Sequence, residues 1–152
     1  MDLNYVIIVL VGIIGSVLTY YVNEHLKQGA VRASALLALI VGLFFYLFPD
    51  VLNEYLSKSI PIVFIGTSFI GMVASHSKGS YLRLALAGIL FSIIYINKGN
   101  FFNGYGGALG TIAFIALLTT MAISNAFSKR KKAKKKIKSF KEKVFKKDKN
   151  SQ

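Results

Sequence analysis

Residues 106–138 read GGALGTIAFIALLTTMAISNAFSKRKKAKKKIK, and the change from uncharged to basic sequence within them decides the fold. No charged residue occurs in 106–127, whereas eight of the ten residues in 129–138 are lysine or arginine. An apolar helix of about 20 residues spans the hydrocarbon core of a bilayer, and lysine and arginine collect on its cytoplasmic side. The segment therefore predicts a transmembrane helix that ends in the cytoplasm.

The composition of the whole chain also indicates a membrane protein. Its 152 residues are 54% hydrophobic, and the mean hydropathy is +0.54. A water-soluble domain of this size cannot bury so much apolar surface, because the buried fraction falls as domains become smaller. The sequence contains no cysteine, which excludes disulfides and cysteine-ligated metal sites.

We expect an all-α fold, a polytopic membrane helix bundle. Five apolar stretches predict its transmembrane helices: 5–22, 30–48, 60–74, 81–96 and 106–127. The third and fourth are short for a hydrocarbon core of about 30 Å, although Arg83 can extend its charged end to the interface. Residues 1–127 then form the transmembrane domain, and residues 128–152 form a polybasic tail.

The distribution of charge supports five crossings. With five helices the N-terminus lies outside, the C-terminus is cytoplasmic, and 17 of the 19 basic residues face inward. Removing any one crossing would place a basic loop or the tail outside, against the positive-inside rule. We therefore expect an integral protein of the cytoplasmic (inner) membrane.

A shift of 50 residues aligns two parts of the chain with each other. It brings Asn53 and Tyr55 onto Asn103 and Tyr105, and several apolar positions also coincide. Because the period contains two helices, the pattern predicts a parallel repeat of two helical hairpins. The alternative is that hairpins of similar composition resemble each other without duplication.

The outer ends of these hairpins contain the residues that we consider for a pore or pocket. Helices interrupted by glycine or proline at matching positions of two halves often mark a transport site. The alternative is ordinary structure: tyrosine favours membrane interfaces, asparagine favours turns, and glycines allow helices to pack closely. The candidates are Asn53, Tyr55, Pro61, Asn103, Tyr105, Gly106, Gly107 and Gly110.

Small residues recur at helical spacing in several predicted helices. Gly12 and Ser16 share one face of the first, and Gly66, Gly71 and Ala74 occur in the third. Such faces let transmembrane helices approach closely. We expect them to mediate packing within the chain, with another copy of the chain, or with a protein partner in the membrane.

The predicted helices lack the groups that ion coupling or catalysis needs. No ionisable side chain lies at mid-depth, which argues against a pump. The polar groups at depth are mainly hydroxyls, including Ser16, Thr67 and Ser92, which usually bond back to their own helix. Only the predicted cytoplasmic rim offers candidates for catalysis, Glu24, His25, His76 and Ser77, and no metal-binding spacing accompanies them. We expect a protein that is not an enzyme and has no cofactor or metal.

The tail combines a strong positive charge with one apolar stripe. Residues 128–152 contain 13 basic and two acidic side chains. Ala133, Ile137, Phe140 and Val144 fall on one helical face, which predicts a basic amphipathic helix on the anionic inner leaflet. Contact with a protein or ribosomal partner, nucleic acid, and plain disorder are the alternatives. The surface comprises Lys129, Arg130, Lys131, Lys132, Lys134, Lys135, Lys136, Ile137, Lys138, Phe140 and Val144.

Three functions are compatible with these features. The first is a small non-enzymatic accessory or scaffolding subunit of a larger membrane complex. The second is a small oligomeric channel or facilitator for a neutral or weakly polar solute. The third is a membrane tether that recruits cytoplasmic machinery through the basic tail.

Overall fold

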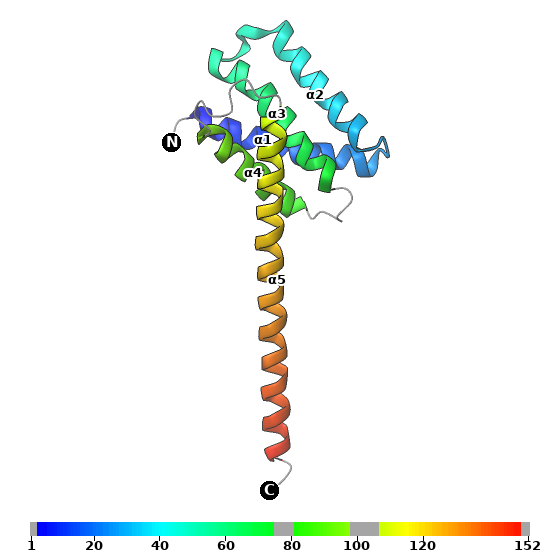
Figure 1. Ribbon diagram of the computed structural model, residues 1–152, viewed down its shortest axis with the longest axis vertical. Coiled ribbons are helices and arrows are strands. Elements are labelled where there is room, and N and C mark those ends of the chain that lie inside the picture. The colour runs from blue at the N-terminus through cyan, green and yellow to red at the C-terminus, as the bar shows by residue number, and fades with distance from the viewer. Residues whose placement is uncertain (1–2, 75–80, 98–106, 150–152) are drawn as a thin grey trace. The chain divides into compact units, whose positions relative to one another are not determined.

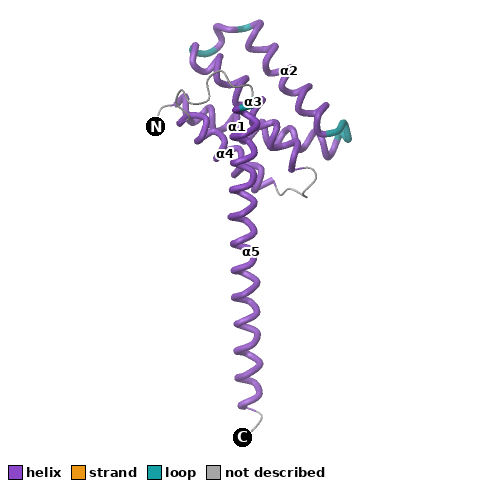
Figure 2. Tube along the Cα trace, viewed as in Figure 1, coloured by secondary structure: helices purple, strands orange, loops and turns teal. Residues whose placement is uncertain are grey.

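The computed structural model describes residues 3–74, 81–97 and 107–149, with side chains described for 3–72, 81–97 and 107–130. The fold is all-α, and no strand occurs in these ranges (Figure 2). Five α-helices and one short 3-10 helix make up the described chain (Figure 1). In order they are α1 Leu3–His25, α2 Ala30–Leu47, η1 Pro49–Val51, α3 Glu54–Ala74, α4 Tyr81–Asn97 and α5 Ala108–Lys149.

Four helices are long and apolar enough to cross a membrane. They are α1, α2, the part of α3 at Glu54–Met72, and the part of α5 at Ala108–Arg130. Helix α4 has 17 residues and is shorter, so it rises only about 25 Å at 1.5 Å per residue. The four long helices agree with the prediction of a multi-pass membrane protein.

Helix α3 begins earlier than the predicted span 60–74. Its first residue is Glu54, because the side-chain Oδ1 of Asn53 accepts a hydrogen bond of 3.0 Å from the backbone N–H of Leu56. Such a cap satisfies a donor that would otherwise be unpaired at a helix start. Pro61 consequently lies inside α3, whereas the predicted span 60–74 would have placed it in the first turn. With 21 residues, α3 is about 31 Å long, which matches the hydrocarbon core.

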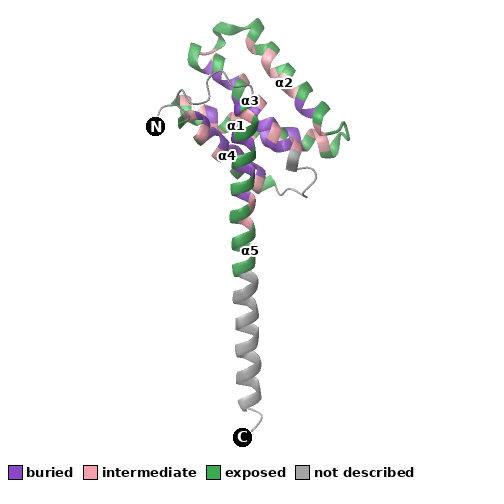
Figure 3. Cartoon of the chain, viewed as in Figure 1, coloured by how far each residue is buried: buried purple, intermediate pink, exposed green. Residues whose placement is uncertain are grey.

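Helices α1, α3 and α4 pack against one another, and α2 packs against α3 and α1. Buried residues occur in α1, α3, α4 and the part of α5 up to Thr120 (Figure 3). By contrast, α2 buries only Ala33 and Ser34, and most of its large apolar side chains are exposed. In a membrane such an exposed apolar face is compatible with lipid or with another helix.

The chain divides into two compact units, Met1–Thr120 and Met121–Gln152. The first unit holds the bundle, including α5 up to Thr120. The described part of the second unit continues α5, and the helix has no break at residues 127–128, where the sequence predicted a change from span to tail. No side chain described between 121 and 130 is buried.

Candidate functional site

A close helix contact in the bundle joins α1 to α4 around two glycines. A Cβ atom at Gly12 would lie 2.8 Å from the carbonyl oxygen of Gly88, and one at Gly88 would lie 2.5 Å from the carbonyl oxygen of Gly12. Real Cβ atoms essentially never come so close to another atom, so each position requires glycine. The absence of both side chains lets the two backbones touch, as small residues do in transmembrane helix pairs.

Two serines one turn away from these glycines complete the α1–α4 contact. The hydroxyl of Ser16 lies 3.1 Å from the carbonyl oxygen of Leu84 across the interface, and that of Ser92 lies 3.3 Å from the carbonyl of Ile8. Each hydroxyl also lies close to the carbonyl of the glycine four residues earlier in its own helix, at 3.1 and 3.0 Å. The arrangement is reciprocal, because the same Gly-x-x-x-Ser pattern occurs in both helices. It is antiparallel, because Ser16 pairs with Leu84 whereas the earlier residue Ile8 pairs with the later residue Ser92.

Helix α1 uses a neighbouring face to pack against α3. A Cβ at Gly71 would lie 2.6 Å from the carbonyl oxygen of Ser16 and 3.1 Å from the backbone nitrogen of Tyr20. A Cβ at Gly15 would collide with the hydroxyl of Thr67. The residue numbers rise together along both helices, from Gly15 beside Thr67 to Tyr20 beside Gly71, so the two helices run parallel. Helix α1 thus contacts α4 and α3 through adjacent stripes of small residues.

One hydrogen bond between side chains connects α2 to α3 in the buried part of the bundle. The hydroxyl oxygens of Ser34 and Ser68 are 2.7 Å apart. Ser68 also lies 2.8 Å from the carbonyl oxygen of Ile65, to which it donates, and this leaves Ser34 as the donor to Ser68. The bond anchors α2 at its N-terminal half, beside its two buried residues.

The expectation that buried hydroxyls bond to their own helix is confirmed at several positions. Thr67 donates to Val63 over 2.8 Å, and Thr120 donates to Ala116 over 2.8 Å. Thr19 differs, because its buried hydroxyl has no hydrogen-bond partner among the described residues. These hydroxyls contribute to helix packing, and none of them adjoins an acid or base that could activate it.

The described pore candidates do not share one cavity. Asn53 caps α3, and its side-chain nitrogen donates to Oδ1 of Asn4 over 3.0 Å at the exposed end of the bundle. Tyr55 is exposed, and Pro61 is half-buried within α3. Asn103, Tyr105 and Gly106 lie outside the described residues.

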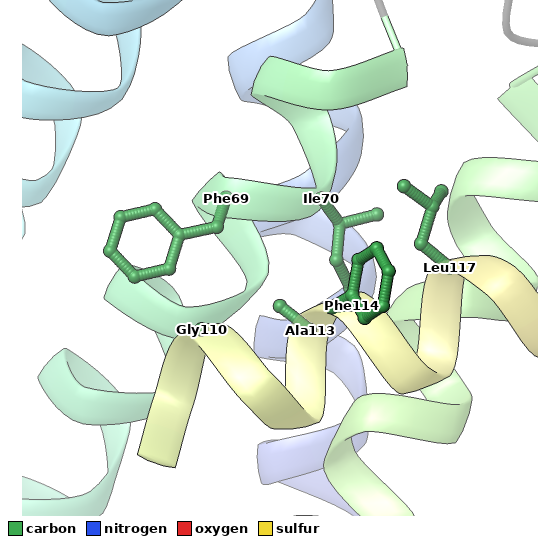
Figure 4. A pocket seen from close by; sticks show the side chains of 6 residues that line it. All are labelled: Phe69, Ile70, Gly110, Ala113, Phe114 and Leu117. Atoms are coloured by element: carbon green, nitrogen blue, oxygen red, sulfur yellow. The ribbon is translucent and has the colours of Figure 1, made fainter. Parts of the chain in front are cut away.

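The other two candidates, Gly107 and Gly110, are exposed near the start of α5. A Cβ at either position would meet no atom within 4 Å. Gly110 does line a cavity of about 180 Å³ between α3 and α5 (Figure 4). All the side chains around this cavity are apolar, from Phe69, Ile70, Ala113, Phe114 and Leu117. The cavity suits a hydrocarbon group and offers no polar contact to a hydrophilic solute.

A second cavity lies at the other side of α3, where α2 gives way to η1. It has a volume of about 270 Å³ and combines apolar and charged residues. Its lysine, Lys58, forms an ion pair of 2.7 Å with Glu54, and both side chains are largely exposed. An exposed pair one helical turn apart stabilises the start of α3 only slightly.

Of the residues considered for acid–base chemistry, Glu24 and His25 lie within the described part of the chain. His25 stacks on Tyr21 with ring centroids 4.3 Å apart, and its side chain is exposed, as is that of Glu24. His76 and Ser77 lie outside the described residues. Within the part of the chain that the structure describes, no three histidine or carboxylate residues gather as a metal site.

The described end of the basic surface consists of Lys129 and Arg130, which are both exposed. The remaining residues of that surface belong to the helical backbone of α5, and their side chains lie outside the described part.

The contact residue that sequence reasoning missed is Gly88. The signal was present, because Gly88 and Ser92 repeat the spacing of Gly12 and Ser16. Asn4 was missed as well, since its partner Asn53 is 49 residues away and no local pattern connects them.

No protein family, no curated protein and no solved structure matches the chain.

Proposed function

We propose that the chain is a non-enzymatic integral membrane protein that packs as an accessory or scaffolding subunit into a larger membrane complex. The observation that supports this proposal is the division of its helix glycines into two classes. One class closes the interior of the bundle, and the other leaves open positions on its outside.

Glycines of the inner class contact a neighbouring helix directly. At Gly12, Gly15, Gly66, Gly71 and Gly88, a Cβ would come closer than 3.0 Å to an atom of a neighbouring helix. The helices α1, α3 and α4 therefore meet backbone to backbone or backbone to side chain at these points. Such close contact leaves no room for a solute path between them, which argues against a channel within one copy.

At glycines of the outer class, an added Cβ would have free space. A Cβ at Gly42 in α2, at Gly107 or at Gly110 in α5 would meet no atom within 4 Å. Small residues on the outside of a membrane helix allow the backbone of another helix to approach closely. We place the partner of the complex on these faces of α2 and α5.

The proposed topology has five crossings, an outer N-terminus and a cytoplasmic tail. The bond from Asn53 to Asn4 places the starts of α1 and α3 at one end of the bundle, and the antiparallel α1–α4 contact places the start of α4 at the other. The second end carries Lys27, Arg32 and Arg83, which the positive-inside rule assigns to the cytoplasm. The short helix α4 crosses if the charged end of Arg83 extends to the interface.

Purification of the full chain in a mild detergent, followed by native mass spectrometry, tests the proposal. We expect a partner protein in fixed stoichiometry, lost in Gly42→Leu or Gly110→Leu because leucine prevents close approach. Leu36→Phe is the matched control: Leu36 is exposed on another side of α2, so the partner should remain. Recovery of the unmodified chain alone would refute the proposed function.

A further inference from the structure

The described side chains of α5 beyond Thr120 are not buried in the bundle. Thr120 is its last buried side chain, and every side chain described from 121 to 130 is exposed or half-exposed. The helix nevertheless continues to Lys149. A helix whose sequence is this polar gains little from burial within the bundle, so an external surface would be needed to stabilise it.

We propose that residues 129–149 of α5 bind an anionic lipid surface, namely the leaflet beside which the tail emerges. Because α5 is continuous from Ala108 to Lys149, this binding requires the helix to bend between its apolar part and the tail. Lysines then contact the lipid phosphates, and the stripe at Ile137, Phe140 and Val144 enters the headgroup region. The proposal is independent of the accessory-subunit function, since it requires no protein partner.

Charge complementarity supports a lipid surface. Between residues 128 and 152 there are twelve lysines and one arginine against two acidic residues. Lysines near an anionic leaflet are attracted to it, and the attraction falls off within a Debye length of the surface. Lys129 directly follows the apolar part of α5, so the connection to the span keeps the lysines at a high effective concentration near the membrane.

The register of the helix provides one apolar stripe. In a continuous helix, Ala133, Ile137, Phe140 and Val144 follow one another at intervals of four, three and four residues, and therefore share one face. Lysines at 134, 136, 141 and 143 occupy positions on both sides of that face. This order is typical of helices that bind in the plane of the membrane surface.

The residue types of the tail argue against nucleic acid, a second copy of the segment or an acidic helix as its partner. Nucleic-acid recognition uses arginine forks and aromatic stacking, whereas this surface has one arginine and two phenylalanines. A second copy of the same segment would bring two strongly positive helices together. Lysines spread around the rest of the circumference, without acidic residues at fixed spacing, match a diffuse negative surface better than a single acidic helix.

The absence of cysteine from the chain permits a direct test. The full-length Phe140→Cys variant is labelled with an environment-sensitive fluorophore. It is then placed in nanodiscs of phosphatidylcholine with or without phosphatidylglycerol. The measurement is the quenching of the fluorophore by spin-labelled lipid. We expect several-fold stronger quenching with phosphatidylglycerol, and its loss at high salt. Ser139→Cys, which lies off the stripe, is the matched control and should be quenched much less.

Two results would overturn the proposal. The first is quenching at position 140 that does not depend on phosphatidylglycerol or equals that at position 139. The second is a label that lipid does not affect but that added RNA or an acidic protein shields, which would assign the surface to that partner. Replacing Lys134, Lys135 and Lys136 by glutamate should abolish the quenching, while the circular dichroism of the membrane helices stays unchanged.

Discussion

Gly12 in α1 and Gly88 in α4 face each other so closely that neither position has space for a methyl group. The carbonyl oxygen of each lies within 2.8 Å of the place where the other's Cβ would be. Ser16 and Ser92 flank this point, and each hydroxyl lies within hydrogen-bond distance of a carbonyl of the opposite helix. The contact fixes the antiparallel register of α1 and α4 by backbone approach and by hydrogen bonds together.

Substitution of Gly12 by alanine should destabilise the bundle. The new methyl group would meet the backbone carbonyl of Gly88, which cannot move without shifting α4. Overpacking of this kind costs about 1–3 kcal/mol. Thermal or denaturant unfolding of the purified protein in detergent measures the loss, and Gly88→Ala should show a loss of similar size.

Gly110→Ala is the control for the two alanine variants. No atom lies within 4 Å of a Cβ at this position, so the methyl group causes no clash. Alanine also favours a helix over glycine by up to about 1 kcal/mol. We expect equal or slightly greater stability. A loss as large as that of Gly12→Ala would contradict the distinction between inner and outer glycines.

Removal of the two serine hydroxyls should weaken the α1–α4 contact by a smaller amount. Hydrogen bonds between membrane helices contribute about 0.6 kcal/mol on average and at most about 1.7 kcal/mol. Ser16→Ala and Ser92→Ala should each lower the free energy of unfolding within this range. Because their acceptors differ, Leu84 in one case and Ile8 in the other, the effects in the double variant should be nearly additive. Strong coupling between the two would show that the hydroxyls form one network.

Hydropathy was sufficient to predict the helices of the bundle, but it could not predict all of their ends. The apolar core of α3 is evident in the sequence, whereas its first turn contains Glu54, Ser57 and Lys58 and resembles a loop. The Asn53 cap and the Glu54–Lys58 ion pair convert these polar residues into helix. The start of α3 therefore depends on local hydrogen bonds that an average over a window does not detect.

The sequence also could not predict which helix each stripe of small residues contacts. The stripe at Gly12 and Ser16 and the glycines at 66 and 71 were predicted to pack, and this is confirmed. Nothing in the spacing indicates which helix each stripe meets, because glycines of both classes have the same local pattern. Gly110 lies in a glycine-rich stretch as well, yet a Cβ at this position would meet no atom within 4 Å. The 50-residue repeat stays a prediction, since Asn103 and Tyr105 lie outside the described residues.

The cap at Asn53 gives a test of the structural role of this residue. Asn53→Ala removes the acceptor for the N–H of Leu56 and should cost about 1 kcal/mol of stability. Asn53→Ser retains a capping oxygen and should restore most of the loss. Unfolding in detergent measures both variants. If alanine and serine are equally destabilising, the bond to Asn4 and not the cap explains the effect.

Substitutions at Gly66 and Phe91, which are in contact, should partly compensate for each other's effect on stability. A Cβ at Gly66 would overlap the ring of Phe91, a fully buried side chain of α4. Gly66→Ala should therefore destabilise the protein by about 1–3 kcal/mol. Phe91→Leu alone should also destabilise it, because it leaves a cavity. In the double variant the methyl group occupies part of that cavity, so we expect the loss to be smaller than the sum. A double-mutant cycle that is strictly additive would show that the two positions do not touch.

The hydrogen bond between Ser34 and Ser68 should control how firmly α2 is attached. Apart from this bond, α2 contributes only one other buried side chain, Ala33, so few contacts resist its separation from α3. Ser34→Ala leaves the hydroxyl of Ser68 bonded to Ile65 and should cost less than about 1 kcal/mol of global stability. Its local effect should be larger, because the opening of one weakly held element requires less free energy than unfolding of the whole. We expect faster hydrogen exchange of α2 amides near Ser34 in the alanine variant, with exchange in α1 and α4 unchanged. Ala38→Ser adds a hydroxyl on the same helix at a half-buried position and should leave exchange near Ser34 unaltered. Uniformly accelerated exchange across all helices would mean that the bond stabilises the bundle as a whole and does not act as a local anchor of α2.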